Sequence, residues 1–101
     1  MQARTENDEF VLAAPERLIA GTRSEFRSVA LEHLSALSQD RTELVIDMSR
    51  TVELDASGLG ILVLIQKRAK ERGMSTRLRR AAERVRNLLN LTKLEFLFEL
   101  T

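Results

Sequence analysis

Segments with the pattern of β-strands alternate along this chain with segments of helical periodicity, and this alternation constrains the fold more than any other feature. Apolar runs and alternating patterns predict strands over 10–14, 17–20, 43–48, 74–79 and 94–100. Apolar residues three and four positions apart predict helices over 22–38, 57–72 and 81–91. The order β-β-α-β-α-β-α-β predicts an α/β fold, with a small mixed or mostly parallel β-sheet of four to five strands and three helices.

The segment Glu43–Met48 is predicted to be an interior strand of that sheet. Leu44 and Ile46 point to one face and Val45 to the other, so both faces carry apolar groups. Such a strand is typical of a sheet that helices cover.

Length and composition indicate one domain. The 101 residues suffice for one hydrophobic core, and we expect a flexible N-terminus over 1–8 and a single domain over 9–101. With no cysteine and one histidine, His33, the chain is expected to hold no metal and no cofactor. The longest apolar run, Ile61–Ile65, is far too short to span a bilayer, and the N-terminus lacks a signal-peptide pattern. We therefore expect a cytoplasmic protein without membrane insertion.

Charge is unevenly distributed along the chain. Residues 1–58 carry six basic and eleven acidic side chains, whereas residues 67–86 carry nine basic and two acidic ones. A basic segment can contact nucleic acid or an acidic protein. No aromatic residue lies among its basic side chains, as base stacking would require, so a solvated helix face with its flanks is the favoured interpretation and direct nucleic-acid binding is not expected.

Two helix starts have recognisable capping residues. Thr22 and Glu25 fit a capping box, in which each side chain satisfies a free backbone amide. Ser57 is a candidate N-cap for the following helix. Gly58 and Gly60 weaken the first turn of that helix, which makes sense if another group must approach the backbone closely.

The helix after Ser57 is apolar almost all the way round its first two turns. Leu59, Ile61 and Leu64 cannot all pack against the sheet, so some of them are expected to be exposed or covered only by a loop. Exposed apolar groups beside a serine indicate a protein-binding surface. The alternative is a deeply buried helix with a simple serine cap.

Evidence for catalysis is weak. Asp47 and Asp55 could form a pair for acid–base chemistry, and Ser57 could act as a nucleophile only with His33 as its base. No substrate pocket or positioning motif accompanies them, so no catalytic residue is assigned and the protein is not expected to be an enzyme.

The segment Asp47–Leu62 resembles the signature of STAS domains, the family named for sulphate transporters and anti-sigma factor antagonists. Its centre is Asp55-Ala56-Ser57-Gly58-Leu59, in which Ala56 stands where the family often has serine. The resemblance continues through the basic helix end with Gly73 and through 85–100. It is weakest over 18–22, which lacks the usual turn of the family.

The resemblance implies a regulatory protein-binding module of the anti-sigma factor antagonist type, acting by partner switching. It places the regulatory phosphoserine at Ser57, with a partner that is both anti-sigma factor and serine kinase, and a phosphatase that resets the switch. The expected partner-binding residues surround it: Asp47, Asp55, Ala56, Gly58, Leu59 and Ile61. The chain could also form a homodimer.

A second interpretation keeps the same fold and helix but no phosphoserine switch. It is a STAS subunit or scaffold that docks on a membrane transporter of the lipid-trafficking ABC type. The presence of a serine at position 57 favours the switch.

Overall fold

The computed structural model describes residues 3–6, 9–37 and 42–101. Its main sheet has five strands in the order β1-β2-β4-β6-β7. Their bounds are Ala3–Glu6, Glu9–Ala13, Glu43–Asp47, Ser75–Arg79 and Glu99–Leu100. β1 is antiparallel to β2, and the other neighbours are parallel. The short strands β3 (Arg17–Leu18) and β5 (Glu53–Leu54) pair in parallel as a separate sheet.

Helices connect the parallel strands. These are α1 (Arg23–Ala36), α2 (Ala56–Glu71) and α3 (Glu83–Leu91), and a short 3-10 helix, η1 (Glu95–Leu97), precedes β7. The predicted fold class, a mostly parallel sheet with three helices, is confirmed. Gly73 ends α2 in the left-handed conformation with φ of 77°, as a glycine after a helix often does.

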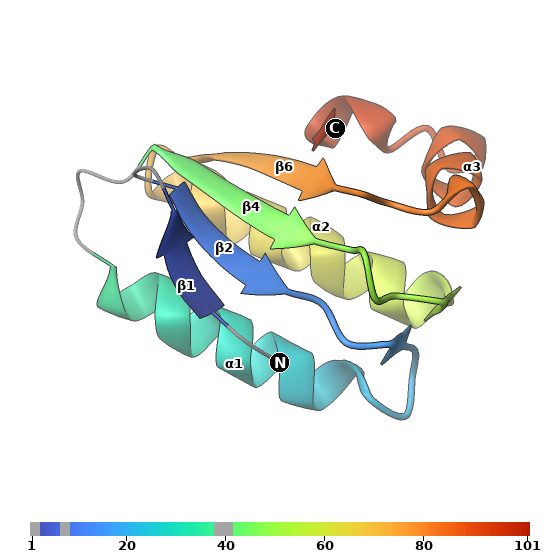
Figure 1. Cartoon of the computed structure of the whole chain (residues 1–101), viewed down its shortest axis with the longest axis horizontal. Helices are drawn as coiled ribbons and strands as arrows, with labels where there is room; N and C mark the ends of the chain where they lie inside the picture. The colour runs from blue at the N-terminus through green and yellow to red at the C-terminus, as the bar shows by residue number, and fades with distance from the viewer. Residues whose placement is uncertain (1–2, 7–8, 38–41) are drawn as a thin grey trace.

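The helices do not cover both faces of the sheet, so this part of the prediction is wrong. Figure 1 shows α1 and α2 side by side on one face, with β2 and β4 open on the other. Side chains on the face of the sheet that the helices cover, such as Leu12, Ile46 and Leu78, pack with the helices in the main core. Val11 and Val45 point to the opposite face and are buried outside that core.

Ion pairs cover the open face of the sheet. Arg77 lies between Glu9 and Glu43, with 3.3 Å from its Nη2 to Glu43 Oε1, and Arg79 donates to Asp47 Oδ2 at 3.1 Å. The basic residues come from β6 and the carboxylates from β2 and β4. Two arginines of the basic segment therefore pair with three carboxylates of the acidic N-terminal half, which reduces the positive charge left for nucleic acid.

The structure differs from the sequence prediction near both ends of the chain. Residues 3–6, expected in a flexible N-terminus, form β1 and pair with β2, while 1–2 and 7–8 lie outside the described residues. The strand predicted over 94–100 is confined to Glu99–Leu100, because η1 occupies the preceding residues. The alternation there is misleading: Phe98 is buried, but Phe96 is 78% exposed.

The start of α1 also differs from the expected capping box. Thr22 stands at the N-cap position, but its side chain makes no capping hydrogen bond. Its hydroxyl donates to the Arg17 carbonyl at 2.6 Å and accepts from the Ile19 amide at 3.1 Å. The hydroxyl therefore stabilises the turn between β3 and α1 instead of the helix.

Candidate functional site

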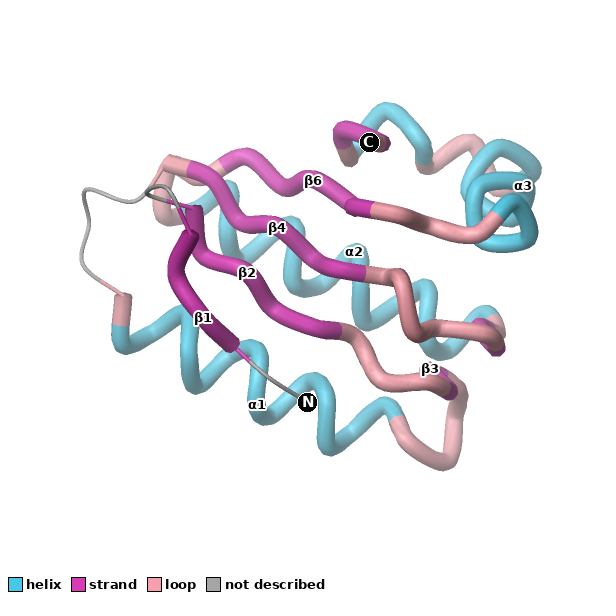
Figure 2. The backbone as a smooth tube through the Cα atoms, in the orientation of Figure 1, coloured by secondary structure: helices cyan, strands magenta, loops and turns pink. Residues whose placement is uncertain are grey.

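Two connections meet beyond the carboxyl ends of β2 and β4, the edge where parallel sheets usually place their sites. Figure 2 shows the connection from β2 through β3 beside the one that follows β4. The Val52 amide donates to the Glu16 carbonyl at 2.8 Å, and the buried Thr51 hydroxyl donates to the Pro15 carbonyl at 2.8 Å. These bonds and the β3–β5 pair hold the start of α2 in place.

Asp55, not Ser57, caps α2, which corrects the expected serine cap. Its Oδ1 accepts from the Gly58 amide at 2.8 Å and its Oδ2 from the Ala20 amide at 3.0 Å. One carboxylate thus joins the first turn of α2 to the loop before α1. The hydrogen bonds from Gly58 and Ala20 hold the pKa of Asp55 below its usual value, with a smaller contribution from the charge of Arg23.

Gly58 is required by packing within the domain. A Cβ atom at this position would lie 1.9 Å from the Leu18 carbonyl oxygen and 2.9 Å from Leu54 Cδ1. The close approach expected for a glycine here is therefore confirmed, but the approaching group is β3 of the same chain. A Cβ atom added at Gly60 would meet nothing within 4 Å, so this position of α2 faces solvent.

Leu59 and Ile61 do not form an exposed patch, so that expectation is wrong. They are only 4% and 7% exposed and belong to the main core. Helix α2 packs against α1 and β6, and it also contacts the short strands β3 and β5. Leu64 is partly exposed, and Val52, at 61% exposure, is the large apolar side chain that the preceding connection leaves in solvent.

Ser57 occupies the second position of α2 and is partly exposed. Small exposed residues belong to the same helix start and to the loop that Asp55 ties to it: Ala56 and Gly60 on α2, and Ala20 and Gly21 on the loop. The serine is therefore neither covered by large side chains of its own turn nor used as a cap. Its backbone amide contributes a further hydrogen bond that lowers the pKa of Asp55.

Asp47 and Asp55 belong to separate hydrogen-bond networks. Asp47 accepts from the Ser49 amide at 2.9 Å and from Arg79 on the open sheet face. Burial raises its pKa, but the bonds from Ser49 and Arg79 outweigh burial and leave the pKa lowered. The structure therefore does not bring the two carboxylates together as an acid–base pair.

The remaining site candidates are placed as follows. His33 is exposed on α1, where its Nδ1 is 2.8 Å from the Val29 carbonyl and its ring stacks on Phe10 at 6.0 Å between centroids. Within the described ranges, no three acidic or histidine side chains are grouped as a metal site would require. In the same part of the chain, no helix has the length and apolar character needed to cross a membrane.

A mostly parallel sheet in which a variant of Asp-Ser-Ser-Gly-Leu, here Asp55-Ala56-Ser57-Gly58-Leu59, begins a helix is the pattern of the STAS class of domains. The chain belongs to the STAS family: residues 1–99 match the family model described as "Mlab, STAS domain". The resemblance seen in the sequence is confirmed.

Solved structures share the fold at low identity. One is a protein from Thermotoga maritima that is described as a "putative anti-sigma factor antagonist". It has 20% identity and a TM-score of 0.85, over 98% of this chain and 83% of that one. The Bacillus cell-fate determinant SpoIIAA in its phosphorylated form has 15% identity and a TM-score of 0.71, over 99% and 89%. The STAS domain of a SulP transporter from Vibrio cholerae has 17% identity and a TM-score of 0.67, over 95% and 76%.

Proposed function

We propose that this protein is an anti-sigma factor antagonist that works by partner switching, with Ser57 as the phosphorylated residue. The observation that carries the proposal is the position of Ser57 itself. It is partly exposed in the first turn of α2, it does not cap the helix, and the exposed residues nearest to it along α2, Ala56 and Gly60, are small. A kinase can reach such a hydroxyl without unfolding the domain.

A phosphate at Ser57 changes the surface more than the core. It adds a charge of about −1.5 to −2 at neutral pH, next to the ionised Asp55. The free amides of a helix N-terminus favour an anion, so the fold survives the modification. A partner docked over the same turn has to desolvate that charge, and therefore dissociates.

The contact surface proposed here differs from the apolar patch expected from the sequence. Because Leu59, Ile61 and Gly58 are buried, the groups that a partner can touch are Ser57 with Ala56 and Gly60. Asp55 acts through its charge and through the loop that it ties down at Ala20. Asp47 is engaged with Arg79, so we assign it no direct contact.

The proposed cycle has three participants. The unmodified protein binds an anti-sigma factor that is also a serine kinase, and this binding releases the sigma factor. Phosphorylation of Ser57 ends the complex, and a phosphatase restores the hydroxyl. SpoIIAA has been solved in both phosphorylated and unphosphorylated forms with this fold, which supports the proposal.

The decisive test compares Ser57→Asp with Ser24→Asp. Ser24 is the second residue of α1 and is exposed, so the control adds the same charge at the same helix position of a different helix. The binding partner for the test is any serine-kinase anti-sigma factor found in the gene's own cluster. Ser57→Asp alone is expected to lose about 3 kcal/mol, or more than 100-fold in affinity, for that partner. Both variants should keep the circular dichroism spectrum of the native protein.

A mass measurement tests the modification directly. Incubation with ATP and that kinase should add about 80 Da, one phosphate group, to the native protein and nothing to Ser57→Ala. Unchanged mass of the native protein, or equal affinity of folded Ser57→Asp, would refute the switch.

The alternative, a STAS subunit that docks on a lipid-trafficking ABC transporter, is favoured by one observation, the description of the matching family model. It predicts co-purification with a transporter ATPase, no change in mass with ATP, and unchanged docking of Ser57→Ala. A permease and an ATPase beside the gene, in place of a kinase and a sigma factor, would support it.

A further inference from the structure

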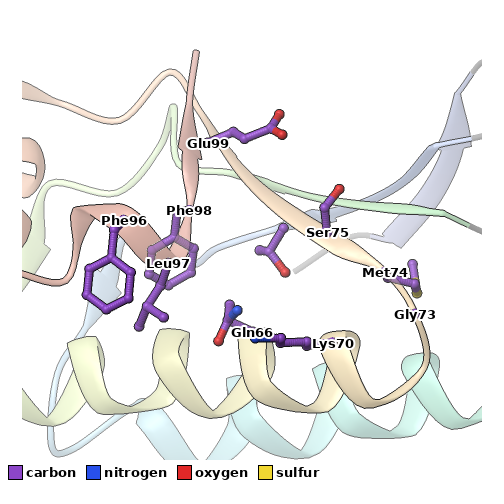
Figure 3. A pocket seen from close by; sticks show the side chains of 10 residues that line it. Gln66, Lys70, Gly73, Met74, Ser75, Phe96, Leu97, Phe98 and Glu99 are labelled. Atoms are coloured by element: carbon purple, nitrogen blue, oxygen red, sulfur yellow. The ribbon is translucent and has the colours of Figure 1, made fainter.

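A groove lies beside the C-terminal half of α2, at the end of that helix opposite to Ser57. Figure 3 shows Gln66 and Lys70 on α2 at one side, and Phe96, Leu97 and Phe98 on the segment that leads into β7. Its volume is about 550 Å³, within the range of about 300–1,000 Å³ that small-molecule sites occupy.

The groove exists because the last strand is short. β7 pairs with β6 only at Arg77–Glu99 and Leu78–Leu100, so among the described residues the first two residues of β6 have β4 on one side and no strand on the other. The chain enters from η1 instead, at a distance that leaves room between η1, β6 and α2. The groove is therefore bounded by three separate elements: strand β6, helix α2, and the η1 segment that leads into β7.

Two polar side chains that line the groove have no hydrogen-bond partner in the described part of the chain. Thr76 is 3% exposed, and its hydroxyl is buried without a partner. Gln66 is 9% exposed as a residue, and its amide, which keeps some contact with solvent, makes no hydrogen bond there either. A group such as the Thr76 hydroxyl is rare in folded proteins, because a buried polar atom without a partner costs free energy. The Thr76 side chain has a hydroxyl oxygen and a methyl group on Cβ. Rotation about the Cα–Cβ bond can turn the hydroxyl towards the groove in place of the methyl group.

The polar groups of the groove next to α2 can all donate hydrogen bonds. Thr76 offers a hydroxyl once its side chain rotates the buried oxygen towards the groove, Gln66 offers an amide NH₂ group, and Lys70 an exposed ammonium group that forms no ion pair with the described residues. Figure 3 shows the Glu99 carboxylate at the end of the groove far from α2, so it does not neutralise Lys70. Three converging donors with one positive charge fit a carboxylate.

The other wall is apolar. Phe98 is buried at 7% exposure and Leu97 is partly buried. Met74, buried at 4% exposure, lies at the other end of the groove beside Gly73 (Figure 3). Phe96 stands at the rim with most of its ring in solvent. An exposed aromatic ring beside a groove is available to cover the hydrocarbon part of a ligand.

We propose that this groove binds a small amphipathic carboxylate, an organic acid with a short acyl chain or one aromatic ring. The carboxylate lies against Thr76, Gln66 and Lys70, and the hydrocarbon lies along Phe98 under Phe96. The site is separate from Ser57, about 14 Å along α2 at 1.5 Å per residue from position 57 to 66, and does not depend on the proposed switch.

The test uses octanoate as the probe and 1-octanol as its uncharged counterpart. Titration of the full chain, followed by backbone amide NMR, should show saturable octanoate binding with shifts centred on 74–76 and 96–98. Thr76→Val removes the hydroxyl at nearly constant shape and should weaken octanoate binding about fivefold, the worth of one hydrogen bond. Because it also removes an unsatisfied group, its folding midpoint should not fall.

A pair of lysine variants tests the role of charge. Lys70→Met should weaken octanoate about fivefold and leave 1-octanol unchanged, whereas Lys67→Met, on the exposed side of α2, should change neither. Three results would overturn the inference: no saturable binding, shifts centred outside the groove, or equal affinity for octanoate and 1-octanol.

Discussion

Gly58 gives the sharpest test of the packing at the start of α2. In Gly58→Ala the new methyl group would sit 1.9 Å from the Leu18 carbonyl oxygen, a backbone atom that cannot rotate away. Ordinary van der Waals contact requires roughly 3.4 Å or more, so α2 and β3 have to separate by about 1.5 Å. That separation disturbs the β3–β5 pair and the hydrogen bond that the Asp55 amide donates to the Leu18 carbonyl.

Gly60→Ala is the matched control, because it makes the same chemical change two residues later with nothing within 4 Å. Alanine is favoured over glycine inside a helix by about 0.8–1 kcal/mol, so this variant should be stabilised by up to that amount. Gly58→Ala has the same propensity gain, but overpacking costs about 1–3 kcal/mol or more. The propensity gain cancels between the two variants, so they should differ in stability by the overpacking cost of about 1–3 kcal/mol or more, with Gly58→Ala the less stable.

Urea unfolding followed by circular dichroism measures this difference, since the chain has no tryptophan or tyrosine to serve as a fluorescence probe. For a domain of this size, about 1 kcal/mol corresponds to a shift of roughly 4–8 °C in the thermal midpoint. If Gly58→Ala proves as stable as Gly60→Ala, the tight contact between α2 and β3 does not exist, and the placement of Ser57 that depends on it is wrong.

The remaining predictions concern charge. The lowered pKa values of Asp47 and Asp55 mean that their ionised carboxylates stabilise the fold above pH 3.8, the usual pKa of an aspartate. This stabilisation is lost as the pH falls below 3.8. The urea midpoint of Asp55→Asn should therefore depend less on pH between about 5 and 3 than that of the native protein. Arg77→Met leaves two partly buried carboxylates unpaired and should cost about 1–3 kcal/mol at pH 7. Arg17→Met breaks the exposed pair with Glu53 and should cost less than about 1 kcal/mol, so equal losses in urea unfolding would contradict this account.

Periodicity was sufficient to predict the fold because each regular element carries its own pattern. The helices at 23–36, 56–71 and 83–91 lie within two residues of their predicted bounds, and β4 is the interior strand that its apolar residues predicted. Alternation failed near the C-terminus because a 3-10 turn exposes Phe96 while Phe98 still reaches the core. Local pattern does not reveal such a turn.

The site was predicted less fully, since its geometry depends on contacts distant in sequence. Both Asp55 and Ser57 are good N-cap residues, and only the Ala20 amide, 35 residues away, shows why the aspartate takes this position. Leu59 and Ile61 are buried because α2 packs against several elements, namely α1, β6 and the two-residue strands β3 and β5, and the local pattern of α2 does not show how many of its sides are covered. A signal was present for Gly58, whose low helix propensity pointed to a close contact.

The parallel arrangement of β2, β4 and β6 also has a consequence for synthesis on the ribosome. β4, which ends at residue 47, lacks its second neighbour until β6 is complete at residue 79. At about 5–20 residues per second, this interval lasts roughly 2–6 seconds. For that time one edge of the central strand stays without a partner, so the nascent chain should be a substrate for chaperones until β6 has been synthesised.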